Sequence, residues 1–150
     1  MQGYRAAVQQ LTLYAQAPEI LTKLAEYGVQ HYIISAYEHV HLNDLVNSFD
    51  IHHLFKGIYG LQKNAVLHKV TLGQQAMRQH QINPETCLII GDTLHDFELS
   101  QALNTHIILL ASGHNSYQKL IETGAPTLHH FNELKMYLID AFSKQSMIDS

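Results

Sequence analysis

Residues 87–96, with the sequence CLIIGDTLHD, join a short apolar run directly to two carboxylates. An apolar run of this length is typical of a buried strand in a parallel sheet. Beyond it, the spacing of apolar side chains indicates a helix, with Leu94, Phe97, Leu99 and Leu103 on one stripe. Asp92 and Asp96 are therefore predicted to lie where a strand gives way to a helix. That is the carboxyl edge of an open α/β sheet, the edge at which such folds bind ligands.

Two chemical roles fit these carboxylates. Asp92 and Asp96 on one turn, beside a Gly91 that lets the backbone bend, suit a hard cation such as Mg²⁺. Thr93 and Asp96 also resemble a capping box, in which side chains satisfy the free amides at a helix start. Asp92 alone is a suitable helix cap as well. The segment by itself leaves both interpretations open.

The composition is that of one soluble globular domain. The chain has 150 residues, of which 46% are hydrophobic and 15% charged, and this length is enough for a sizeable core. The net charge of -4 argues against a general nucleic-acid binder, and no apolar run is long enough to cross a bilayer. The first residues lack the pattern of a signal peptide, and Cys87 is the single cysteine, in a predicted buried strand. A cytoplasmic location is therefore expected.

The histidines are unusually numerous, at 12. They are scattered, and neither the pair His52 and His53 nor the pair His129 and His130 has the ligand spacing of a zinc framework. Surface exposure is the favoured interpretation of most of them.

The predicted elements alternate along the chain. Helices are expected at 18–28, 42–49, 69–80, from 94, 117–123 and 131–142, and strands at 32–35, 87–91, 106–111 and 126–128. Residues 1–16 are expected to be helical, 55–60 a loop or short strand, and 143–150 a polar tail. This rhythm predicts an α/β fold, three-layered and Rossmann-like, with a mainly parallel sheet.

Two further polar residues stand at predicted strand ends or helix starts. Ser35 follows an apolar strand, where a hydroxyl and the free amides beyond it can hold a phosphoryl oxygen; a turn cap is the alternative. Lys69 lies near a helix N-terminus, where the helix dipole disfavours a cation, which suggests a phosphate or carboxylate partner. A solvated surface lysine is the alternative. For 112–114, Ser-Gly-His, a simple turn is preferred over a role in the site.

The order of these features resembles a known family. A strand followed by Ser35, a helix start with Lys69, and the Gly-Asp-x-x-x-Asp of 91–96 resemble the second, third and fourth motifs of the haloacid dehalogenase superfamily. The phosphoglycolate-phosphatase-like hydrolases are the most similar branch. The helix expected at 18–28 and the Asn-Pro-Glu-Thr of 83–86 resemble the family's approaches to its second and fourth motifs. The resemblance runs from about residue 17 to the end of the last helix.

The resemblance implies a phosphatase site. Asp92 would be a Mg²⁺ ligand, and Asp96 a second ligand or an acid in the outer shell. Ser35 and the amide of Ala36 would hold the phosphoryl group of a small phosphorylated molecule, and Lys69 would neutralise charge between the phosphate and the nucleophile. Phosphoryl transfer depends on this kind of positioning and charge neutralisation.

One part of the family pattern is absent. Family phosphatases open with a strand ending in Asp-x-Asp, whose first Asp is the nucleophile, and no Asp-x-Asp occurs in this sequence. The aspartates outside 91–96 fall in predicted helices, a loop and the tail: Asp44, Asp50, Asp140 and Asp149. The chain is therefore expected to lack the first central strand and most of the cap. Its expected parts are a cap or linker remnant at 1–16, a core at 17–144 and a tail at 145–150.

Three explanations of the missing strand remain open. The chain is a truncated product or cloned fragment, or residues 1–16 reorganise to fill the gap, or the strands close up, with a homo-oligomer covering the edge. Activity by the standard route is expected to be weak or absent. The alternative function is a non-catalytic binding or interaction protein on the same fold. An unrelated doubly wound domain is a third possibility, but no glycine-rich phosphate fingerprint follows any predicted strand.

Overall fold

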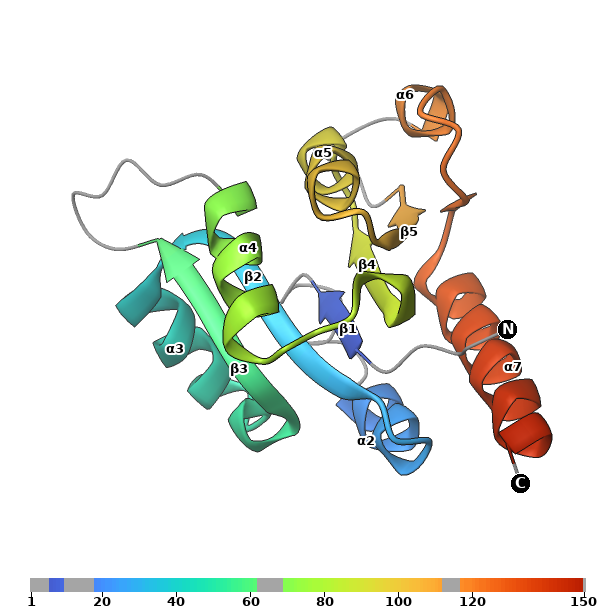
Figure 1. Ribbon diagram of the computed structural model, residues 1–150, viewed down its shortest axis with the longest axis horizontal. Coiled ribbons are helices and arrows are strands. Elements are labelled where there is room, and N and C mark those ends of the chain that lie inside the picture. The colour runs from blue at the N-terminus through green and yellow to red at the C-terminus, as the bar shows by residue number, and fades with distance from the viewer. Residues whose placement is uncertain (1–5, 10–17, 62–68, 112–116, 150) are drawn as a thin grey trace.

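A computed structural model describes residues 6–9, 18–61, 69–111 and 117–149 (Figure 1). Within these residues the strands form one six-stranded sheet in the order β3-β2-β1-β4-β5-β6, and every neighbouring pair is parallel. The strands are β1 (Ala6–Gln9), β2 (Gln30–Glu38), β3 (Phe55–Leu61), β4 (Cys87–Gly91), β5 (His106–Leu110) and β6 (Thr127–Leu128). The predicted parallel sheet is confirmed.

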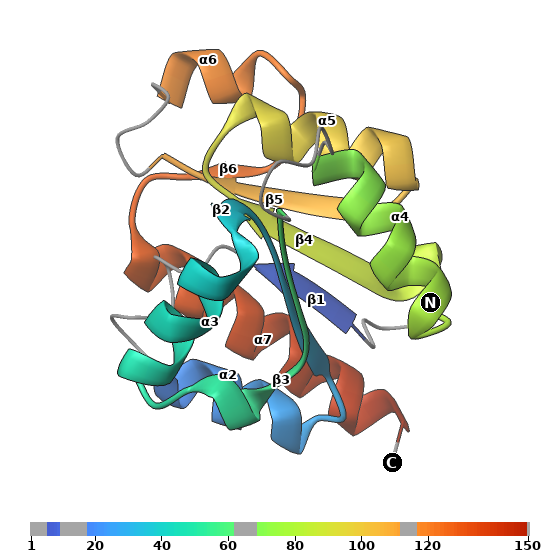
Figure 2. The ribbon, with the colours of Figure 1, turned by 90° about the vertical axis from the view of Figure 1, so that its left-hand side faces the viewer.

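Helices cover both faces of this sheet (Figure 2). One face carries α2 (Pro18–Glu26), α3 (His39–Ser48) and α7 (Phe131–Asp149), and the other carries α4 (Lys69–Gln79), α5 (Leu94–Leu103) and α6 (Tyr117–Ile121). Short 3₁₀ turns at His52–Leu54 and Pro84–Thr86 precede β3 and β4. The fold is the expected three-layer Rossmann-like arrangement. No described helix has the length and apolar character needed to cross a membrane.

The apolar run of β4 is buried on both faces of the sheet. Leu88 and Ile90 belong to the core cluster on the face that carries α2, α3 and α7, whereas Cys87 and Ile89 belong to the cluster on the face that carries α4 and α5. Alternate side chains of a strand point to opposite faces, so a central strand needs apolar residues at every position. Burial raises the pKa of the Cys87 thiol to about 12, which leaves it a small apolar core residue.

The predicted gap in the middle of the sheet is filled, which corrects two expectations. The four-residue strand β1 lies between β2 and β4 and pairs in parallel with both, with Ala7 opposite His31 and Leu88. An empty position would leave two buried strand edges without hydrogen-bond partners, and an extended segment removes both. Part of the segment 1–16, expected to be helical, is thus a strand. This agrees with the explanation in which those residues reorganise.

Several element ends differ from the sequence expectations. Residues expected as a loop or short strand form β3, an edge strand of the described sheet. β2 continues to Glu38, whose carboxylate caps α3 by accepting the N–H groups of Val40 and His41 at 3.2 and 3.0 Å; these bonds lower the pKa of Glu38. α7 runs to Asp149, so most of the expected polar tail is helical.

Candidate active site at the carboxyl edge of the sheet

Asp96 organises the turn that connects β4 to α5. Its Oδ2 accepts the N–H groups of Asp92 and Thr93 at 3.0 and 3.1 Å and the Thr93 hydroxyl at 3.0 Å. In return, the Asp96 N–H donates to Thr93 Oγ1 at 3.3 Å, which completes a capping box. The helix-capping interpretation of Thr93 and Asp96 is therefore confirmed.

Lys69 lies against the same carboxylate. Its Nζ is 2.6 Å from Asp96 Oδ1, although Lys69 begins α4 and Asp96 lies in the first turn of α5. The Lys69 side chain is 16% exposed and that of Asp96 is 1% exposed. Lys69 is thus not a solvated surface lysine: a carboxylate partner offsets its unfavourable place near a helix N-terminus.

These contacts bear on the two roles expected of Asp96. One of its oxygens accepts three hydrogen bonds and the other binds an ammonium group, so both oxygens are engaged by the protein. A carboxylate held in this way positions its neighbours instead of offering itself to an ion. The geometry favours the outer-shell role and leaves Asp92, which is buried at 5% exposure, as the candidate direct ligand.

Ser35 and Asp92 lie at the same level of the sheet. Gln9 of β1 pairs with Ile33 of β2 and Ile90 of β4, so Ser35 and Asp92 each lie two positions beyond that level. Strands on either side of a third are separated by about 10 Å. The two side chains, both buried, therefore flank the line of β1 at its carboxyl end.

The structure gives less detail on the other residues that were predicted to belong to the site. Ser35 lies inside β2 and not at its end, although the regular pairing of β2 with β1 and β3 stops at Ile33 and Ile34. The backbone of Ala36 continues β2. Residues 112–114 lie outside the described residues. Within the described ranges, no three His, Cys, Asp or Glu side chains gather as a metal site.

The side chains at this edge of the sheet can supply only part of the ligands of a Mg²⁺ ion. Mg²⁺ in proteins keeps several waters and is commonly held by one or two carboxylates together with phosphate oxygens. Asp92 supplies one such carboxylate at the sheet edge, and the pair of Lys69 and Asp96 stands beside it. The residues present therefore fit an ion that would be shared with a phosphate, and not a site closed by the protein alone.

Gly91 is needed for space, which the sequence did not indicate. A Cβ at this position would collide with the Cβ, Cγ and Oδ2 atoms of Asp96. Gly91→Ala is therefore expected to displace the Asp96 side chain and to lower the free energy of unfolding by about 1–3 kcal/mol, the usual cost of overpacking. Urea denaturation measures this loss.

The matched control is the double variant Gly91→Ala with Asp96→Gly, because glycine at 96 removes the Cβ as well as the carboxylate. If the collision with Asp96 is the cause, the double variant costs little more than Asp96→Gly alone. Fully additive losses would contradict this explanation.

Comparison of the sequence with models of known protein families identifies the family of this chain. The family model for haloacid dehalogenase-like hydrolases matches residues 1–110. The chain belongs to the haloacid dehalogenase-like hydrolase family. The resemblance to that family is thereby confirmed. No curated protein matches the sequence.

Solved structures of this haloacid dehalogenase-like fold are similar over most of the chain. A predicted phosphatase from Clostridium acetobutylicum is 22% identical, with a TM-score of 0.78 over 85% of this chain and 60% of that chain. A haloacid dehalogenase-like family hydrolase from Streptococcus pneumoniae is 28% identical, with a TM-score of 0.72 over 81% and 58%. The core domain of a candidate phosphoglycolate phosphatase, also from Streptococcus pneumoniae, is 19% identical, with a TM-score of 0.66 over 91% and 96%. The chain spans about three fifths of the first two structures and nearly all of the core domain.

Proposed function

We propose that this chain is the phosphate- and Mg²⁺-binding core of a hydrolase that acts on small phosphate monoesters. The observation that carries the proposal is the buried ion pair of Lys69 and Asp96 beside Asp92, at the ligand-binding edge of a parallel sheet. An ammonium group fixed at that edge can neutralise a phosphate, which is the main requirement of phosphoryl transfer.

Each residue has a separate part in this proposal. Asp96 holds the Lys69 ammonium so that it faces the site with little freedom, and this avoids the cost of ordering a long side chain on binding. Ser35 Oγ and the Ala36 N–H donate to phosphoryl oxygens, and the Asp92 carboxylate binds the metal. Mg²⁺, when bound, would supply further neutralisation of the phosphate charge.

Turnover is proposed to be weak or absent in this chain. The nucleophile of family phosphatases follows the central strand, and here that strand is Ala6–Gln9, followed in the sequence by Gln10 and Leu11. Neither residue is a carboxylate, so no aspartyl-phosphate can form there. This same observation favours the second candidate, a protein that binds a phosphorylated molecule without hydrolysing it. A homo-oligomer was expected only as a cover for a gap in the sheet. Because β1 lies between β2 and β4, the described sheet has no such gap to cover.

The experiment that tests the proposal measures binding and turnover separately. Calorimetry with inorganic phosphate in the presence of Mg²⁺ is expected to show binding that weakens about tenfold or more in Asp92→Asn and Ser35→Ala, since each removes a charged or charge-assisted contact. Thr71→Ala on the exposed face of α4 is the control and should bind as the wild type does.

The two outcomes have different meanings. Failure of the wild type to bind phosphate with Mg²⁺ would contradict the proposed site. Hydrolysis of p-nitrophenyl phosphate that Asp92→Asn abolishes would support the site but contradict the absence of turnover.

A further inference from the structure

Gly73 is the single glycine inside the described helices, and it is buried in the second turn of α4. Only proline disfavours the interior of a helix more than glycine does. A buried glycine in a helix is therefore expected where a neighbouring element comes too close for a side chain. The element that packs beside α4 on this face of the sheet is α5 (Figure 2).

The contact between Gly73 and α5 is closer than a side chain would allow. A Cβ at position 73 would lie 2.8 Å from Leu103 Cδ1 and 2.9 Å from Leu99 Cδ1. Carbon atoms in ordinary contact are about 3.5–4.0 Å apart. An alanine at this position therefore requires the two leucines, or the helix that carries them, to move by about 0.6–1.2 Å.

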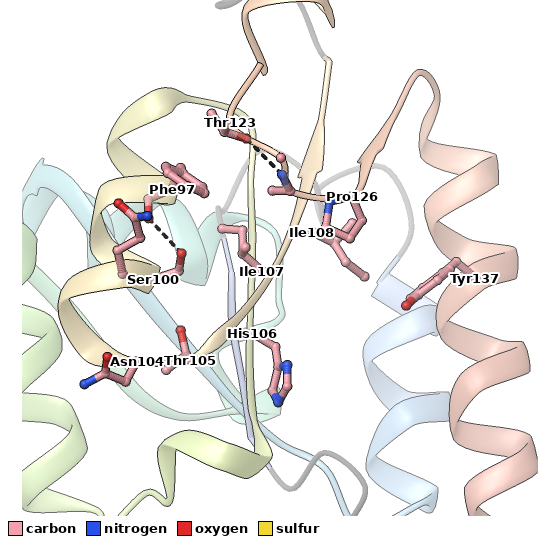
Figure 3. Close-up of a pocket in the computed structure, with 13 residues that line it drawn as sticks. Phe97, Ser100, Asn104, Thr105, His106, Ile107, Ile108, Thr123, Pro126 and Tyr137 are labelled. Carbon is pink, nitrogen blue, oxygen red and sulfur yellow. Dashed lines mark hydrogen bonds between the residues drawn. The ribbon is translucent and has the colours of Figure 1, made fainter. Parts of the chain in front are cut away.

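The two leucines have little room to move by themselves. Leu99 and Leu103 are 1% and 7% exposed and belong to the same core cluster as Leu72 and Ala76 of α4. Open space lies on another side of α5, where Phe97 and its neighbours line a pocket of about 720 Å³ that neither leucine borders (Figure 3). An added methyl group on α4 is thus expected to push α5 as a whole away from α4.

This contact lies next to the ion pair of Lys69 and Asp96. Residues three, four or seven apart share one face of a helix, so Gly73 lies one turn from Lys69 on α4. By the same spacing, Leu99 and Leu103 share the face of α5 that carries Asp96. Separation of the helices would lengthen the 2.6 Å distance between Lys69 Nζ and Asp96 Oδ1 past the about 2.7–2.9 Å that is typical of a charge-assisted bond.

We propose that Gly73 is a positioning residue of the phosphate site. It lets α5 lie close to α4 one turn from Lys69, which brings the Asp96 carboxylate to the lysine ammonium and fixes the ammonium at the site. Gly73 touches no ligand and acts through Lys69. The effect on phosphate binding rests on the proposed function, whereas the effect on the ion pair does not.

The test follows the side-chain ammonium signal of Lys69 in ¹⁵N-labelled protein, because an ammonium group held by a carboxylate exchanges its protons with water more slowly than a free one. The signal is assigned by its loss in Lys69→Met. We expect a sharp signal in the wild type and a broadened or absent one in Gly73→Ala. Calorimetry with inorganic phosphate and Mg²⁺ is expected to show an affinity about fivefold weaker in Gly73→Ala, the worth of one net hydrogen bond.

Three further variants separate positioning from a general loss of stability. Gly73→Ala combined with Leu103→Val removes two of the three Cδ atoms nearest to the new methyl group and gives the third room to move. This double variant should regain both the ammonium signal and the phosphate affinity, and Leu103→Val alone should keep both. Gln74→Ala places an alanine at an exposed position of the same helix and should behave as the wild type does.

Two results would overturn the proposal. An unchanged Lys69 signal in folded Gly73→Ala would show that the leucines or the lysine stem absorb the added methyl group. A Gly73→Ala chain that does not fold would show that the contact serves the whole fold and not the ion pair. If the Lys69 signal responds as expected but the wild type binds no phosphate, the proposed function fails and the positioning of the ammonium by Gly73 is supported.

Discussion

Asp96→Ala is expected to lower the free energy of unfolding by about 3–5 kcal/mol, the usual cost of removing one partner from a buried ion pair. The Lys69 ammonium, whose side chain is only 16% exposed, would lose the carboxylate at 2.6 Å. The N–H groups of Asp92 and Thr93 would lose their shared acceptor at the same time. Urea denaturation at neutral pH measures the loss.

Asp96→Asn separates the two contributions. The amide oxygen of Asn can still accept the capping hydrogen bonds, but the side chain no longer carries a charge for Lys69. Its loss of stability is therefore expected to be smaller than that of Asp96→Ala. A double-mutant cycle with Lys69→Met gives the coupling energy of the pair, and a coupling near zero would contradict the importance assigned to it.

This ion pair links stability to the proposed function. The ammonium group that would meet a phosphate is held by the carboxylate that also caps α5 and fixes the turn after β4. A phosphate site built in this way does not need to order Lys69 when ligand binds. It follows that variants of Asp96 should reduce phosphate affinity even though Asp96 itself does not touch the ligand.

The strand and helix on either side of Asp92 could be predicted because their signals are local. β4 is apolar at nearly every position and α5 begins with a capping box, so neither depends on distant residues. β1 could not be predicted, because a four-residue segment such as Ala6–Gln9 becomes a strand only when β2 and β4 already offer two open edges. Pairing with the neighbouring strands, and not local propensity, determines that this segment is a strand.

The site also combines features that the local sequence predicts with features that only tertiary packing decides. Motif order was enough to select Ser35, Lys69 and Asp92, and the register of β1 with its neighbours explains why two of them lie at one level. Lys69 and Asp96 are 27 positions apart in the sequence and lie on two different helices. No rule based on local residue spacing predicts their contact. Only the packing of α4 on α5 decides whether Asp96 serves a metal or holds a lysine.

His31 is buried, unlike most of the described histidines, and it should make the fold sensitive to acid. It is 2% exposed in β2, and its Nε2–H donates to the Leu21 carbonyl of α2 at 3.1 Å. Burial lowers the pKa of His31 from 6.5 to about 4, against a smaller opposing effect of that hydrogen bond. Between these values the unfolded chain binds the proton and the folded chain does not. Stability is therefore fully present above pH 6.5 and falls by about 3 kcal/mol as the pH drops to 4.

The variant His31→Gln tests this linkage, because Gln can still donate to the Leu21 carbonyl but does not titrate in this range. Urea denaturation at pH 7, 5.5 and 4.5 is expected to show a steeper loss of stability in the wild type than in His31→Gln. His53→Gln, on the exposed turn before β3, controls for the removal of an imidazole and should keep the wild-type pH dependence. Parallel curves for the wild type and His31→Gln would mean that the buried imidazole accepts its proton without opening the contact between β2 and α2.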